Sequence, residues 1–158
     1  MVIHMIQPFQ IVFYKGSSFI GKLIRKLTKS SYSHCALALD SLHLIQLDWR
    51  NPVSIQHLSY KPSDYDVYHL TFTLTESEKE QITEYIINQL STTYDWKYIG
   101  SRFFNVLFGT KIYNSKEKSN CDELIIEAFR SIGINLLNGD EQVSPETLSK
   151  SKLLNKIE

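Results

Sequence analysis

The chain has 158 residues, of which 42% are hydrophobic and 22% are charged, a composition typical of a globular protein with one core. Its 17 basic and 17 acidic side chains cancel, so no positive excess favours nucleic acid, and we expect no nucleic-acid partner. No apolar run approaches the roughly 20 residues that span a bilayer, and the first residues lack a signal-peptide pattern. We therefore expect one domain over residues 1–158, without an integral membrane segment, in the cytoplasm or packaged in a virus particle.

The first half of the sequence predicts antiparallel strands and one helix. In the helix, at residues 17–27, apolar side chains recur at helical spacing and basic side chains occupy the other side. The strands are expected at residues 10–14, 33–39, 42–49, 52–57 and 66–72, and a hairpin at Asp40 and Ser41 joins the second strand to the third.

The second half of the sequence changes to helical periodicity. Thr75 and Glu78 form a capping-box pattern at the start of a helix that continues towards residue 90. Further helices are expected at residues 94–108 and 121–132 and after an N-cap at Ser144. Strands mostly in the first half and helices mostly in the second predict an α+β domain.

The chain has two cysteines, Cys35 and Cys121, too few for a disulfide framework or a four-cysteine zinc site. No group of His, Cys and Asp has the spacing of metal ligands, so we expect no metal and no other cofactor. Cys121 opens the helix at 121–132, where unpaired backbone amides and the helix dipole favour a thiolate and could bind an oxyanion. Cys121 is therefore a candidate nucleophile; the alternative is an inert cysteine at a helix start.

A thiolate nucleophile needs a base within hydrogen-bond reach. Among the five histidines, His34 is distinctive because it enters the apolar strand at 35–39, which would place its ring at the mouth of a buried strand. A surface or structural histidine is the alternative. Cys35 should point to the opposite face of that strand, as a small buried residue without a disulfide to Cys121. The histidines interpreted as structural or solvated are His4, His43, His57 and His69.

Five short segments follow one another in a fixed order: Ser33-His34-Cys-Ala-Leu-Ala-Leu39, Leu44-Ile-Gln46-Leu, Tyr94-Asp-Trp96, Asn120-Cys121-Asp-Glu-Leu124 and Ser144-Pro-Glu-Thr-Leu148. Together they resemble the circularly permuted papain-like hydrolases, the NlpC-type and YiiX-like proteins. The resemblance covers nearly the whole chain and implies an antiparallel sheet or half-barrel packed against helices. It also implies that an early histidine and a later cysteine form the catalytic pair, in the order that permutation produces.

The resemblance implies that Cys121 is the nucleophile and that His34 acts as general base and then as general acid. Gln46 stands at the position that is usually acidic, where it would orient the imidazole through its carbonyl oxygen without supplying charge. Asp48, expected on the same face of the strand as Gln46, is the second choice for this role. The residues expected at the substrate are Tyr94, Trp96 and Asp48, with core aromatics as the alternative for the first two.

The expected reaction is hydrolysis of an amide, isopeptide or ester bond through a thioester on Cys121, on a peptide, peptidoglycan-like or acyl substrate, as in a cell-wall amidase. One alternative is a lipid acyltransferase or phospholipase like the lecithin:retinol acyltransferase relatives. These proteins have an Asn-Cys-Glu-like segment, and residues 120–122 resemble it. Another is a non-catalytic structural or virion module, which Gln46 in place of an acid favours. A phosphate-binding loop from Gly16 is discarded, because Leu23 replaces the Ser or Thr that would hold magnesium.

Overall fold

The computed structural model describes residues 5–16, 18–48, 51–59, 61–89, 121–139 and 142–157. Six strands lie within these residues: β1 (Ile11–Tyr14), β2 (His34–Ala38), β3 (His43–Asp48), β4 (Asn51–His57), β5 (Tyr65–Leu70) and β6 (Leu154–Lys156). They form one sheet in the order β4-β3-β2-β1-β5-β6, and every neighbouring pair is antiparallel. The expected α+β fold with an antiparallel sheet is confirmed.

β1 lies between β2 and β5 and is buried on both faces. Phe13 is paired with Cys35 and belongs to the core on one face of the sheet, whereas Val12 is paired with Ala36 and belongs to a smaller cluster on the other face. A strand that is covered on both sides needs a continuous apolar run rather than an alternating one. This explains the segment Ile-Val-Phe at 11–13.

The sequence did not predict β6, which pairs with β5 close to the C-terminus. Its Leu154 is buried, while the other two residues of the strand are exposed. Three residues are too few to show the alternation by which strands are recognised. The sequence therefore predicted no strand in this segment, although its α+β prediction holds. The aromatic-rich helix expected at 94–108 lies outside the described residues.

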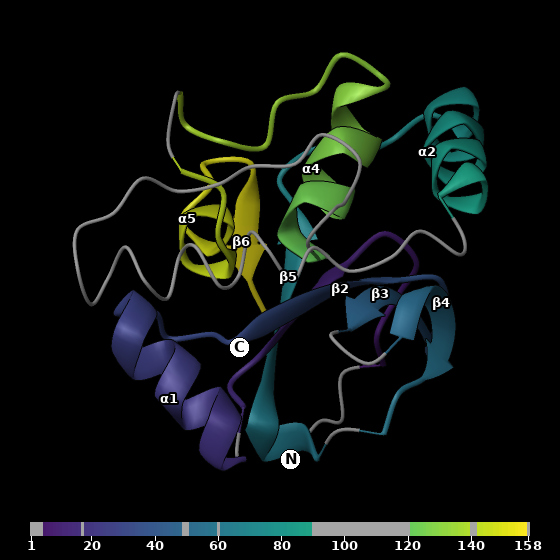
Figure 1. The fold of residues 1–158 in the computed structure, drawn as a ribbon. Helices are drawn as coiled ribbons and strands as arrows, with labels where there is room; N and C mark the ends of the chain where they lie inside the picture. The colour runs from purple at the N-terminus through teal and green to yellow at the C-terminus, as the bar shows by residue number, and fades with distance from the viewer. Residues whose placement is uncertain are drawn as a thin grey trace.

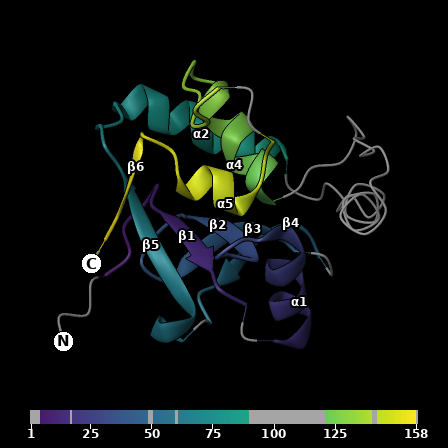
Figure 2. The same ribbon diagram turned by 90° about the vertical axis from the view of Figure 1, so that its left-hand side faces the viewer.

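The helices lie on both sides of the sheet (Figures 1 and 2). Those described are α1 (Phe19–Thr28), the short 3-10 helix η1 (Pro62–Asp64), α2 (Glu76–Asn88), α4 (Cys121–Arg130) and α5 (Pro145–Ser149). In both views α2, α4 and α5 cover one face of the sheet, and α1 lies on the other side. The capping box at Thr75 and Glu78 and the N-cap at Ser144 are both present, as the sequence predicted.

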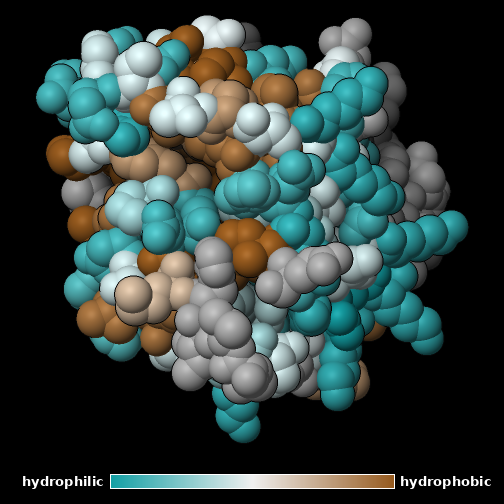
Figure 3. Space-filling view, turned by 180° about the vertical axis from the view of Figure 1, so that it is seen from behind, coloured by the Kyte–Doolittle hydropathy of each residue, from teal (hydrophilic) through white to brown (hydrophobic). Residues whose placement is uncertain are grey.

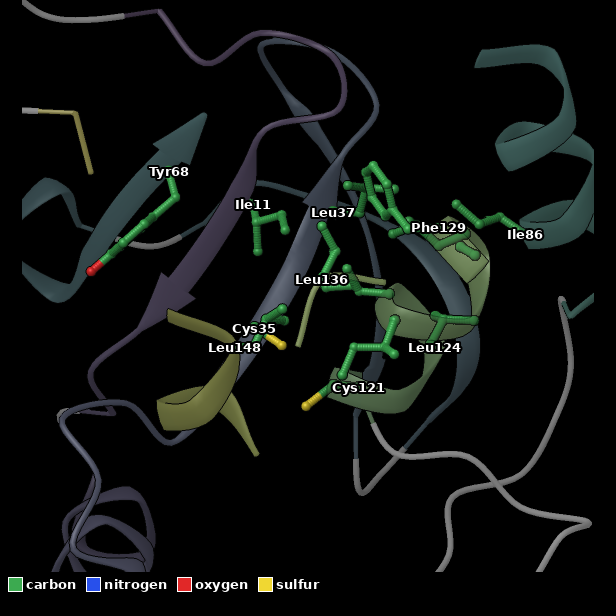
Figure 4. Packing of buried hydrophobic residues seen from close by; sticks show 14 of the residues in the cluster. Ile11, Cys35, Leu37, Tyr68, Ile86, Cys121, Leu124, Phe129, Leu136 and Leu148 are labelled. Carbon is green, nitrogen blue, oxygen red and sulfur yellow. The ribbon is translucent and has the colours of Figure 1, made fainter. Parts of the chain in front are cut away.

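α4 closes the main core against β2 and β3 (Figure 4). Its apolar side chains Leu124, Ile125, Ala128 and Phe129 are all 2% exposed or less. Their spacing places them on one face of the helix, and a large apolar side chain buried in this way stabilises a fold by about 1.5–3 kcal/mol. Packing of this face therefore fixes the first residue of α4, Cys121, beside the sheet.

Two glycines of the discarded phosphate-loop pattern have a packing role. Gly16 has a φ of +62°, and a Cβ added there would overlap the hydroxyl of Ser33. A Cβ on Gly21 would come within 2.8 Å of the Cα of Gly16. The glycines thus let the end of β1 and the start of α1 approach each other beside Ser33, the residue before His34. Close packing accounts for both of them without a phosphate.

The surface mixes hydrophilic and hydrophobic side chains. Seen from behind (Figure 3), hydrophilic side chains are prominent in the right-hand part of the molecule, and hydrophobic ones reach the surface on the left, in the upper middle and near the centre. The most exposed large apolar side chains come from different parts of the chain: Met5, Phe19, Leu42, Ile55 and Ile87. None of the helices that the structure describes is long and apolar enough to cross a membrane.

Candidate active site

Three neighbouring strands bring His34 together with a series of polar side chains. His34 is the first residue of β2, and its Nε2–H donates a hydrogen bond of 2.9 Å to Oε1 of Gln46 on β3. Nε2 of Gln46 donates to Oε1 of Gln56 on β4 at 2.8 Å, and Nε2 of Gln56 donates to Oγ of Ser54 at 3.1 Å. We call these four residues the amide chain.

Gln46 is buried, with 6% of its surface exposed. A buried polar group is costly unless it is hydrogen-bonded, and a buried carboxylate is far more costly unless a cation is paired with it. The glutamine meets this requirement with a neutral side chain, which contacts His34 at one end and Gln56 at the other. Gln46 therefore contacts the imidazole through a hydrogen bond and without a charge.

Cys121 lies at the start of α4 with 5% of its surface exposed, and its Sγ is 3.9 Å from Oδ1 of Asp122. The pKa of Cys121 is well below its ordinary value: a hydrogen bond from the Cys35 thiol is the largest cause, burial opposes it, and the charge and hydrogen bond of His34 lower it further. The folded protein therefore favours the thiolate. This stabilisation is present above the pKa of an unfolded cysteine, about 8.5, and is lost as the pH falls through the folded value.

Cys35 is a second thiol in this site. It is fully buried in the core that α4 covers, and Figure 4 shows the side chains of Cys35 and Cys121 reaching towards each other between β2 and α4. Burial, together with the neighbouring Cys121, raises the pKa of Cys35 well above its ordinary value. Cys35 therefore stays protonated and can donate to the thiolate. Both cysteines are free, and the sequence did not reveal their contact.

Asp122 is a further buried polar residue beside the thiols, with 3% of its surface exposed. It lies in the first turn of α4, where the helix dipole stabilises a negative charge. After burial and the contact with Cys121, its charge also raises the pKa of Cys35. The segment at 120–124 placed Asp122 next to the candidate nucleophile in sequence, but nothing in its pattern indicated that the carboxylate is buried.

The segment before β2 is held by α5. Oε2 of Glu146 accepts a hydrogen bond of 2.7 Å from the backbone N–H of Ser31, and Oε1 forms a 2.9 Å ion pair with Lys150. Burial raises the pKa of Glu146, but the Ser31 amide and Lys150 outweigh it and lower that pKa overall. Ser31, which Glu146 contacts, lies three residues before His34. The Ser144–Leu148 segment therefore has a structural role, because it anchors the start of the histidine strand.

The described part of the structure does not place the other three candidates, Asp48, Tyr94 and Trp96, at the site. Asp48 ends β3, and the register with β4 shifts between Gln46 and Asp48, so the regular alternation that would put both on one face is disturbed there. The side chain of Asp48, like the whole of Tyr94 and Trp96, lies outside what the structure describes. All three stay expectations.

The other described histidines lie at or near the surface and are not members of the amide chain. His43 Nδ1 is 2.9 Å from Oδ2 of Asp40, in an exposed pair next to the hairpin turn. His57 and His69 are exposed residues of β4 and β5. His4 lies outside the described residues.

The comparisons with known proteins concern the fold. No protein-family model matches the sequence, and no curated protein matches it. The solved structure of metalloprotein yiiX from Escherichia coli O157:H7 does match, with a TM-score of 0.73 and 14% sequence identity over 98% of each chain. At this identity the match shows the fold alone. The predicted YiiX-like fold is thus confirmed over nearly the whole chain.

The description of yiiX as a metalloprotein raises the question of a metal site in this chain. Within the described residues, no group of three or more His, Cys, Asp or Glu side chains is placed to hold a metal ion. The described residues therefore do not fit a metal centre.

Proposed function

We propose that this protein is a cysteine hydrolase in which Cys121 is the nucleophile and His34 is the base. The observation that carries the proposal is the packing of α4, which begins with Cys121, against β2, which begins with His34. The lowered pKa of Cys121, to which the Cys35 thiol and the His34 imidazole contribute, supports it. This imidazole is hydrogen-bonded to Gln46 through Nε2. A nucleophile, a base and a residue that orients the base form the arrangement that nucleophilic catalysis requires, in whatever order the chain supplies them. The likeness of the fold to yiiX agrees with the family resemblance of the five segments.

In the acylation step, His34 takes the thiol proton. Because Nε2–H donates to Gln46, Nδ1 of the neutral ring carries no proton and can accept the one on Sγ of Cys121. The thiolate attacks the carbonyl carbon of the substrate, and the electron pair of the C=O bond moves to the oxygen. Backbone N–H groups in the first turn of α4 have no partner within the helix and stabilise this oxyanion. His34 then protonates the leaving nitrogen or oxygen, and a thioester remains on Cys121.

In the deacylation step, His34 acts as a base for the second time. It takes a proton from water, and the hydroxide oxygen attacks the thioester carbon. The tetrahedral intermediate expels the Cys121 thiolate and releases a carboxylic acid. The low pKa of Cys121 makes its thiolate a good leaving group in this step. Through both steps Gln46 keeps the ring in one orientation.

The substrate class that this chemistry serves is an amide, isopeptide or ester bond in a peptide, a peptidoglycan-like or an acyl substrate. Purified wild type, Cys121→Ala and His34→Gln should be incubated with muropeptides, ubiquitin-like conjugates and phospholipids, and the products identified by mass spectrometry. We expect wild type to cleave an amide or isopeptide substrate and both variants to lose at least about a hundredfold in rate, as for the loss of a general base. His57→Gln, which changes an exposed histidine of β4, should keep full activity.

The same panel separates the alternatives. Release of fatty acid from phospholipid, abolished in Cys121→Ala, would favour the lipid acyl-transfer alternative. Absence of turnover on every substrate, combined with a Cys121 thiol that reacts as slowly as Cys35, would instead support a non-catalytic module.

A further inference from the structure

All the hydrogen bonds of the amide chain run in one direction, from His34 through Gln46 and Gln56 to Ser54. The amide of Gln46 uses both ends: its oxygen accepts from His34 and its nitrogen donates to Gln56. The amide of Gln56 is used in the same sense, since its oxygen accepts from Gln46 and its nitrogen donates to Ser54. Every donor therefore points away from the imidazole.

A glutamine, unlike a carboxylate, can contact a histidine in two ways. If the Gln46 amide were turned over, its NH₂ group would face Nε2, and that nitrogen would have to accept. The proton of a neutral ring would then lie on Nδ1, the nitrogen that must be free to take a proton from Cys121. A carboxylate only accepts and has no such second arrangement. Gln46 therefore needs a partner that favours one orientation of its amide.

We infer that Gln56 is this partner: a positioning residue whose carbonyl oxygen holds the Gln46 amide in the orientation that keeps the His34 proton on Nε2. The effect on Cys121 rests on the proposed function, whereas the contact between Gln56 and Gln46 does not depend on it. Gln46 lies opposite Ser54 and Leu44 lies opposite Gln56 in the β3–β4 register. Gln56 is thus diagonal to Gln46 on the neighbouring strand, a position from which long side chains interact.

Two variants at Gln56 separate acceptance of a hydrogen bond from mere packing. Gln56→Met keeps the length of the side chain and removes the acceptor, whereas Gln56→Glu keeps an acceptor and removes the donor. Gln81→Met is the matched control, because Gln81 is exposed in α2 and its side-chain amide donates to Ser77 of the same helix. Circular dichroism should show that each variant is folded.

The direct readout is the tautomer of His34, measured by ¹⁵N NMR of the imidazole. The measurement uses the Cys121→Ala background near pH 8, about where an ordinary histidine is neutral, so that no thiolate keeps the ring charged. We expect the His34 proton on Nε2 in the Cys121→Ala parent and in the double variants that add Gln56→Glu or Gln81→Met. In the double variant with Gln56→Met we expect a substantial fraction of the proton on Nδ1. Should Gln56→Met fail to fold, Gln56→Lys replaces the acceptor by a donor and should also move the proton to Nδ1.

The second readout is the alkylation rate of Cys121 by iodoacetamide at neutral pH in proteins that retain the cysteine. We expect Gln56→Met to lower this rate about threefold to tenfold, the effect of one hydrogen bond, and Gln56→Glu to restore it. An unchanged Nε2 proton in Gln56→Met, or loss of that proton from Nε2 in Gln56→Glu, would overturn the inference. If Cys121 of the wild type reacts no faster than Cys35, the proposed function fails, while the tautomer still decides the role of Gln56.

Discussion

Replacing Cys35 by alanine removes the largest single cause of the low pKa of Cys121. The Cys35 thiol donates to the thiolate in a site where the two residues are 0% and 5% exposed, which leaves little room for water to replace it. A hydrogen bond to a charged group contributes roughly 1.5–3 kcal/mol, and about 1.4 kcal/mol corresponds to a factor of ten. We therefore expect the thiolate fraction of Cys121 on the acid side of its titration to fall by roughly ten- to a hundredfold.

The assay is a pH titration of thiolate absorbance in the ultraviolet. Cys35→Ala and its control Cys35→Ser each contain one cysteine, so the signal comes from Cys121 alone. The serine hydroxyl can still donate to the thiolate, and we expect Cys35→Ser to titrate at lower pH than Cys35→Ala. Superimposable curves for the two variants, both equal to the acid limb of the wild type, would refute the view that the buried thiol stabilises the thiolate.

Two further substitutions test how the site is held in place. Gly16→Ala should destabilise the fold more than Gly133→Ala: both residues have a positive φ, for which a side chain costs about 1–2 kcal/mol, but only at Gly16 would the new Cβ overlap Ser33, while Gly133 faces open space. Thermal unfolding measures the difference, and equal losses would contradict the packing role. Glu146→Gln should lower the free energy of unfolding at neutral pH, because it removes the charge that Ser31 and Lys150 contact. Since the pKa of Glu146 is lowered by folding, the deficit should disappear as denaturant unfolding is repeated below about pH 4, the ordinary range of a glutamate.

Much of the fold was predictable because its elements have strong local signals. The apolar stripe of α4, the capping box of α2 and the continuous apolar run of β1 follow from helix and strand periodicity. β6 was not predictable, because its pairing with β5 depends on tertiary contacts and not on its own three residues.

The candidate site was predictable only in part. Cys121 stands out by its place at a helix start, His34 by its place before an apolar strand, and Gln46 by the family resemblance. The contact between Cys35 and Cys121 was missed because strand alternation does not reveal that α4 covers the face of Cys35. Gln56 was missed because its contact with Gln46 depends on the β3–β4 register, which a sequence does not specify.

The pH profile of Cys121 alkylation tests the central claim most directly. Iodoacetamide labelling of the wild type and of His34→Gln should be followed by mass spectrometry, with Cys35 as the internal reference in each sample. We predict that Cys121 of the wild type reacts well below pH 8.5, roughly the pKa of a free cysteine, much faster than Cys35, and that His34→Gln moves its profile to higher pH. A wild-type profile centred near that ordinary value and unchanged in His34→Gln would contradict the account.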